Sequence, residues 1–175
     1  MKKTIGVLCG LLLAAPVMAE SLLVHVNSID ANGIVEDIGF IEVSISPYGV
    51  VFKPEIEKMT PGLHGFHIHQ NPTCAPGTKD GKKVAGLAAG GHWDPEHTGK
   101  HLGPYSHDGH KGDLPDLYAD ENGNMRLPVL APRISVEDLK GHSLIIHAKP
   151  DNYSDDPAEN GGSGARVACA IIKEE

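Results

Sequence analysis

The stretch LHGFHIH, residues 63–69, decides the fold and points to the chemistry. Its polar and apolar residues alternate, which predicts a β-strand whose successive side chains face opposite sides. Phe66 and Ile68 share the apolar face, so His67 and His69 share the other face. Two such side chains lie about 6–7 Å apart along a strand, which is close enough for both to bind one metal ion.

The same parity argument separates the other histidines near strands. His64 shares the parity of Phe66 and Ile68, which favours a hydrogen-bonded core histidine over a metal ligand. In the apolar stretch 143–148, Leu144 and Ile146 face the core, whereas His147 takes the opposite face. We therefore expect three outward-facing histidines, His67, His69 and His147, on two strands of one sheet.

The rest of the chain alternates in a similar way, and regular helix is almost absent. Short segments with Gly, Pro, Asn and Asp turns between them predict an all-β, eight-stranded antiparallel Greek-key barrel or sandwich. The expected strands are 22–30, 39–46, 50–57, 63–69, 114–119, 125–130, 143–148 and 166–172, with 114–119 and 125–130 forming a hairpin. Residues 135–138 resemble a capping box and predict one short helical turn.

Two long segments, 70–113 and 149–165, have no regular pattern, and long loops in a compact domain are usually functional. The first of them carries a second candidate metal site. His92, His101, His110 and Asp113 offer three imidazoles and a carboxylate, a closed tetrahedral set suited to structural zinc. Ligand chemistry alone does not choose these histidines over His97 and His107, whose roles stay open.

The chain begins with features of a secretory signal. A positive start at Lys2 and Lys3 precedes an apolar stretch and small residues before Glu20, which predicts a leader at 1–19 and one mature domain at 20–175. In an exported protein the isolated pair Cys74 and Cys169 indicates one disulfide bond. A thiolate metal pair is the alternative, but it lacks the close spacing that zinc sites prefer.

The charge of the chain limits its partners. The formal net charge is −8 at neutral pH, and it becomes more negative without the two leader lysines. Such a chain is not expected to bind nucleic acid or an anionic membrane through its overall field. No segment after the leader is long and apolar enough to span a membrane.

Five motifs together resemble the copper/zinc superoxide dismutase family, and most closely its bacterial periplasmic branch. They occur in the order of the family and cover essentially the whole mature chain. The motifs are GFHIH at 65–69, GHWDP at 91–95, HLGP at 101–104, HKGDL at 110–114 and GARVAC at 164–169. The resemblance implies a periplasmic enzyme.

The resemblance also implies roles for individual residues. Copper would be bound by His67, His69, His92 and His147, and zinc by His92, His101, His110 and Asp113. His92 would bridge the two metals and carry a proton during turnover. Asp151 would hydrogen-bond both His67 and His101, and Arg166 would guide the anionic substrate toward copper.

The expected activity is the conversion of superoxide to oxygen and hydrogen peroxide, with copper and zinc ions as cofactors. The main alternative is an exported module that stores or delivers copper and zinc without turnover. That module explains the histidines, but it does not explain Arg166 or a bridging ligand. The sequence leaves a homodimer open, because no exposed strand indicates an interface.

Overall fold

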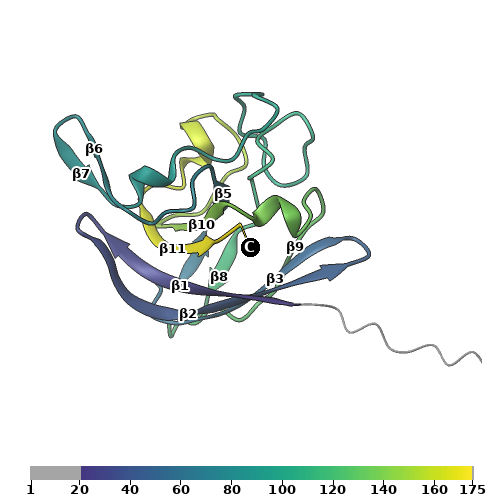
Figure 1. The fold of residues 1–175 in the computed structure, drawn as a ribbon, viewed down its shortest axis with the longest axis horizontal. Helices are drawn as coiled ribbons and strands as arrows, with labels where there is room; N and C mark the ends of the chain where they lie inside the picture. The colour runs from purple at the N-terminus through teal and green to yellow at the C-terminus, as the bar shows by residue number, and fades with distance from the viewer. Residues whose placement is uncertain (1–20, 175) are drawn as a thin grey trace, which may run out of the picture.

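The computed structural model describes residues 21–174, and its regular structure is antiparallel β-sheet with three short 3₁₀ turns (Figure 1). The all-β prediction is therefore confirmed. The strand count of eight is not confirmed, because the described part contains eleven strands, several of them only three residues long. They are β1 (Leu22–Asp30), β2 (Gly33–Ser46), β3 (Gly49–Ile56), β4 (Gly62–His64), β5 (Phe66–His69), β6 (Gly77–Lys79), β7 (Lys82–Val84), β8 (Leu117–Ala119), β9 (Val129–Ala131), β10 (His142–His147) and β11 (Arg166–Ile172).

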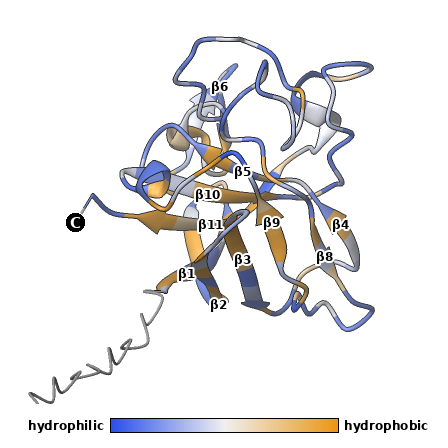
Figure 2. Ribbon diagram, turned by 90° about the vertical axis from the view of Figure 1, so that its right-hand side faces the viewer, coloured by the Kyte–Doolittle hydropathy of each residue, from blue (hydrophilic) through white to orange (hydrophobic). Residues whose placement is uncertain are grey.

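The main sheet has the order β5-β10-β11-β1-β2-β3-β9, and β4 pairs with β8 beside it. Neighbours such as β5 and β10 are far apart in sequence, so long connections cross between them in a Greek-key arrangement. Figure 2 shows the strands curling around an apolar interior, with the long loops gathered at one end. This arrangement places the two functional segments together.

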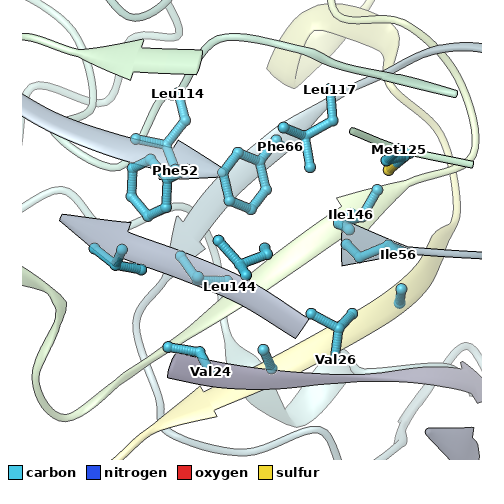
Figure 3. Packing of buried hydrophobic residues seen from close by; sticks show 14 of the residues in the cluster. Val24, Val26, Phe52, Ile56, Phe66, Leu114, Leu117, Met125, Leu144 and Ile146 are labelled. Atoms are coloured by element: carbon cyan, nitrogen blue, oxygen red, sulfur yellow. The ribbon is translucent and has the colours of Figure 1, made fainter. Parts of the chain in front are cut away.

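The core fills the inside of the curled sheet. Phe52 of β3 and Phe66 of β5 are fully buried and meet edge to face, with ring centroids 5.3 Å apart. Leu114, Leu144 and Ile146 pack around them (Figure 3). The residues of β5 and β10 that face this core leave the opposite face of both strands for the histidines, as the alternation predicts.

The stretch 63–69 forms two strands, not one continuous strand. Gly65 separates them, because its N–H donates to the Lys149 carbonyl and its own carbonyl accepts the His147 N–H. A Cβ at this position would lie 2.6 Å from the Ser163 Cβ, so only glycine allows the approach. The chain therefore switches partners here: β4 pairs with β8, and β5 pairs with β10.

The predicted hairpin of residues 114–119 and 125–130 is confirmed only at its turn, where the Asp120 N–H donates to the Asn124 carbonyl. Only one bridge, between Ala119 and Met125, joins its two arms, and the arms have different main partners. β8 pairs with β4, and β9 pairs with β3. Met125 exchanges backbone hydrogen bonds with Ile56, which draws this arm away from β8.

The expectation that residues 70–113 lack regular structure is also wrong. They contain the β6–β7 hairpin and a 3₁₀ turn at Leu87–Ala89. Asp80-Gly81 connects β6 and β7, both with positive φ, and such a pair is a recognised hairpin signal that indicates the turn. The short helical turn near 135–138 is confirmed as Glu137–Leu139, with Ser135 and Asp138 capping each other.

Two further expectations concern the chain as a whole. Cys74 and Cys169 form a disulfide that ties the long loop to β11, with the two Cα atoms 5.8 Å apart. The predicted leader at 1–19 lies outside the described residues. Among residues 21–174, no helix is long and apolar enough to cross a membrane.

Candidate metal centre

Three histidines meet on the outer face of β5 and β10. Ile145 lies opposite His67 across the two strands, and His147 follows two residues later on the same face. A register irregularity between Ile146 and His147 turns the end of β10 toward the cluster. His67 and His69 are 0% exposed and His147 is 5% exposed, because the long loops cover this face. The predicted trio is thus brought together.

The loop 70–113 runs back twice along the free edge of β5 and delivers the other site residues. Isolated bridges pair His69 with His92 and His67 with Asp113. The Ile68 N–H donates to the Gly112 carbonyl, and the Ile68 carbonyl accepts the Trp93 N–H. These strand-like hydrogen bonds pair the backbone groups of the loop with β5 and so hold the loop against it.

His92, His101 and His110 surround one carboxylate oxygen of Asp113. The Nδ1 atoms of His92 and His101 each lie 3.0 Å from Asp113 Oδ1, and the Nδ1 of His110 lies 3.4 Å from it. The side chains of Asp113 and His101 are fully buried. These are the four residues for which the sequence predicts a zinc site.

Within residues 21–174, two groups of potential metal ligands have one ligand atom from each residue within 4.8 Å of all the others. The first is the predicted copper set, and the second joins His67, His92, His101 and Asp113. His92 and His67 belong to both groups, and of these two only His92 is a member of both predicted ligand sets. The second group contains His67 in place of His110, whose ring centroid lies 5.4 Å from that of His92.

The ring nitrogens provide the test of whether metals fit here. His67, His69 and His147 each use one nitrogen in a hydrogen bond, to Asp151, to the Gly90 carbonyl and to the Gly164 carbonyl. Their other nitrogens are buried without any hydrogen-bond partner, as are the Nδ1 atoms of His101 and His110. Unpaired buried polar atoms are costly, so their convergence fits metal ligands.

The protonation states agree with this interpretation. Burial holds the pKa values of His67 and His69 well below the ordinary histidine value, and it lowers the pKa of His147 to about 4. These imidazoles are therefore neutral at pH 7 and keep the lone pair that binds a metal. Burial raises the pKa of Asp113, but the neighbouring imidazoles of His101, His110 and His92 outweigh it and keep the carboxylate charged.

Asp151 connects the two sets of ligands. One of its carboxylate oxygens lies 2.7 Å from His67 Nε2, and the other lies 2.8 Å from His101 Nε2. Gly161 makes room for it, since a Cβ there would lie 1.7 Å from Asp151 Oδ1. The segment 149–165 thus contributes the residue that links both predicted sites.

Two residues that support Asp151 were missed by the sequence reasoning. Asp116 Oδ2 accepts the backbone N–H of Asp151, and the Tyr153 hydroxyl accepts the backbone N–H of Asp116. The Tyr153 N–H closes the ring by donating to Asp151 Oδ1. Burial raises the pKa of Asp116 to about 6. No local pattern could have shown the role of Asp116, because its contacts with Asp151 and Tyr153 join segments far apart in sequence.

Arg166 lies beside His147, its register partner across β10 and β11. Its guanidinium donates to the carbonyls of Gly86 and Gly90, which belong to the loop that the disulfide anchors. Arg166 also contributes, after burial and His92, to the low pKa of His69. A fixed cation therefore stands next to the predicted copper set.

The three remaining histidines of this region lie apart from both groups. His64 is 1% exposed, and its ring nitrogens lie 2.6 and 2.7 Å from the carbonyl oxygens of His147 and Thr60. The prediction of a hydrogen-bonded core histidine is confirmed. His97 and His107 are exposed, and neither belongs to a potential metal group of the described residues.

Comparison with known proteins shows the class of protein that this fold and site define. The family model for copper/zinc superoxide dismutase matches residues 37–172, so the chain belongs to that family. A copper-zinc superoxide dismutase of Salmonella typhimurium (strain 4/74) is 54% identical over 177 residues, covering 99% of this chain and 100% of the relative.

Solved structures of related proteins support the same family membership. The copper/zinc superoxide dismutase of Brucella abortus has a TM-score of 0.85 and 48% identity, covering 88% of this chain and 100% of that chain. The solution structure of the monomeric enzyme of Salmonella enterica has a TM-score of 0.79 and 45% identity, covering 88% and 100%. The chain is an enzyme that converts superoxide to oxygen and hydrogen peroxide, and copper and zinc are its cofactors.

Proposed function

We propose that His67, His69, His92 and His147 bind the copper ion of this dismutase, and that His92, His101, His110 and Asp113 bind the zinc ion. The observation that carries the assignment is the convergence of unpartnered, buried ring nitrogens from both predicted sets. When bound, copper supplies the one-electron redox chemistry, and zinc supplies a fixed charge that supports the bridging imidazole.

The chain's own residues orient these ligands. The Nδ1 of His92 lies 3.0 Å from Asp113 Oδ1, so its Nε2 would serve the copper set and would be the atom that takes and gives up a proton in turnover. Asp151 orients His67 and His101 together by accepting from both rings. The carbonyls of Gly90 and Gly164 fix His69 and His147 in the same way.

Arg166 is proposed as the residue that attracts superoxide. The chain has a net charge of −8, so its overall field repels an anion, and a local cation beside copper is needed. The Gly86 and Gly90 carbonyls hold the guanidinium in place next to His147. A planar, permanently charged group suits both attraction and orientation of a small anion.

Superoxide decay measured for Arg166 variants across a salt series tests this function. Arg166→Ala should lower the second-order rate about tenfold or more at low salt, Arg166→Glu should lower it further, and Arg166→Lys should lie between wild type and Arg166→Ala. These differences should shrink as salt screens the charge. Lys149→Ala, which removes an exposed cation, is the matched control.

Metal analysis of the same samples separates the alternatives. All variants should keep wild-type copper and zinc, since neither metal needs Arg166 as a ligand. A storage or delivery module would show metal binding without superoxide decay in the wild type. Equal rates for all Arg166 variants at matched metal content would show that the residue plays no part in catalysis.

We further propose that the chain is exported to the periplasm and cut between Ala19 and Glu20, leaving the domain 20–175. The leader composition, the disulfide and the bacterial relatives support this proposal. Mass measurement of the protein from a periplasmic fraction tests it, and an uncut chain in the cytoplasm would contradict it. The homodimer stays a prediction that sedimentation of the purified protein can test.

A further inference from the structure

The four proposed zinc ligands are not equally shielded from solvent. The side chains of His101 and Asp113 are 0% exposed, and that of His92 is 4% exposed. The side chain of His110 is 12% exposed, more than any other member of the set. Solvent therefore reaches this set of ligands mainly at His110.

His110 lines a surface hollow of about 510 Å³ together with Gly99, Asp155, Glu159 and Asn160. Its Nδ1, by contrast, is buried, has no hydrogen-bond partner and lies 3.4 Å from Asp113 Oδ1. The ring thus has one edge in the hollow and a free ligand atom inside the site. This connection distinguishes the hollow from an ordinary acidic surface.

The two charged residues that line the hollow are both acidic. Asp155 accepts the backbone N–H groups of His101 and Asn160, at 2.8 and 3.0 Å. Its negative charge is therefore fixed beside a proposed ligand. Glu159 is exposed, and within residues 21–174 it forms no ion pair. A divalent cation is attracted to such a place.

The neighbouring copper set has the opposite charge beside it. Arg166 lies next to His147 and repels cations while it attracts anions. The two proposed metal sets share His92, yet one is flanked by a guanidinium and the other by two carboxylates. This difference in charge favours the approach of an anionic substrate to the copper set and the approach of a metal cation to the zinc set.

We propose that the acidic hollow at Asp155 and Glu159 is the route by which zinc reaches its site, with His110 as the first ligand it meets. The inference rests on the proposed zinc ligands and adds the path by which the ion arrives. Glu159 acts by attracting the cation, and it is not a ligand in the finished site. Its charge should therefore affect the rate of uptake and leave the zinc content at completion unchanged.

Stopped-flow mixing of the metal-free, disulfide-intact protein with zinc sulfate tests the route. Trp93, the single tryptophan of the chain, directly follows His92 and can report uptake by fluorescence, and a zinc-sensitive dye gives a second readout. A divalent ion passing about 6 Å from a unit charge in screened water predicts a rate effect of roughly threefold. Glu159→Gln should slow uptake by that factor, and Glu159→Lys should slow it more.

Glu121→Gln is the matched control, because it removes the same charge from an exposed turn elsewhere in the fold. Wild-type uptake rates in both Glu159 variants, or equal slowing by Glu121→Gln, would overturn the route. The final zinc content and the activity of the loaded enzyme should be the same in all variants. A metal-free protein that took up no zinc at all would overturn the proposed zinc site as well, so the two failures are distinguishable.

Discussion

At the scale of single residues, the two ring nitrogens of each buried histidine in the proposed copper set have different roles. In His67, His69 and His147 one nitrogen is fixed by a carboxylate or carbonyl, and the other is left free toward the centre. The fixed nitrogen sets the orientation of the ring, and burial keeps the ring neutral. The residues are thus arranged for ligation before any metal arrives.

His147→Ala should remove copper and most activity while zinc content and the fold are retained. Its ring reaches the copper set only, since it is absent from the group that contains Asp113. The loss of copper affinity should exceed the roughly 10–100-fold that follows loss of an outer partner of a ligand. Metal analysis and superoxide decay measure it, with His107→Ala as an exposed control. Full activity in His147→Ala would contradict the copper assignment.

Zinc binding should depend on pH through His101. Burial lowers its pKa, but Asp113 and Asp151 outweigh burial and raise the pKa to about 9 in the metal-free protein. Below pH 9 His101 therefore carries a proton that zinc must displace, so zinc affinity should rise roughly tenfold per pH unit between pH 6 and 8. Calorimetry in buffers of different ionisation enthalpy would count the released proton. Zinc binding without proton release would contradict this pKa.

At the scale of elements, the disulfide connects the strand that carries Arg166 to the loop that positions it. Cys169 lies on β11 three residues after Arg166, and Cys74 lies in the loop whose Gly86 and Gly90 carbonyls accept from the guanidinium. One covalent bond therefore stabilises both the loop and the placement of the proposed guiding residue.

Removing the disulfide by Cys74→Ala and Cys169→Ala together should lower the free energy of unfolding by about 2–5 kcal/mol. The loop 70–113 should become more open to proteolysis, and the superoxide rate should fall because Arg166 loses its fixed carbonyl partners. Denaturant unfolding and limited proteolysis of the double variant against the oxidised wild type measure both effects. Unchanged unfolding and an unchanged cleavage pattern would contradict the role of the bond.

The elements differ in how well the sequence predicts them. The strands at 22–30 and 166–172 have the expected bounds, because alternation and turn residues define both ends. The partners of Met125 and the break at Gly65 could not be predicted, since they depend on contacts with Ile56, Lys149 and Ser163 across the fold. The proposed ligands could be selected from the sequence, by strand parity for His67, His69 and His147 and by the family motifs for the others, whereas Asp116 and Tyr153 had no such signal.

At the scale of the whole molecule, the core stabilises the barrel on one face of β5 and the proposed metal ligands occupy the other. Phe52→Ala should therefore lower the free energy of unfolding by about 3–5 kcal/mol, since a fully buried aromatic ring is lost. Metal content at low temperature should remain that of the wild type. Tyr48→Ala, at a side chain that is 76% exposed, should change stability by less than about 0.5 kcal/mol. Similar losses from both variants would contradict this division.

The place of β11 in the sheet has a consequence for biosynthesis. This strand, near the carboxyl end of the chain, lies between β1 and β10, so the first and last strands are neighbours. Until it is made, β1 and β10 both expose unpaired backbone groups, and the sheet cannot close. The sheet therefore cannot be completed until residues 166–172 have been synthesised, and a fragment that ends before residue 166 would be prone to aggregation.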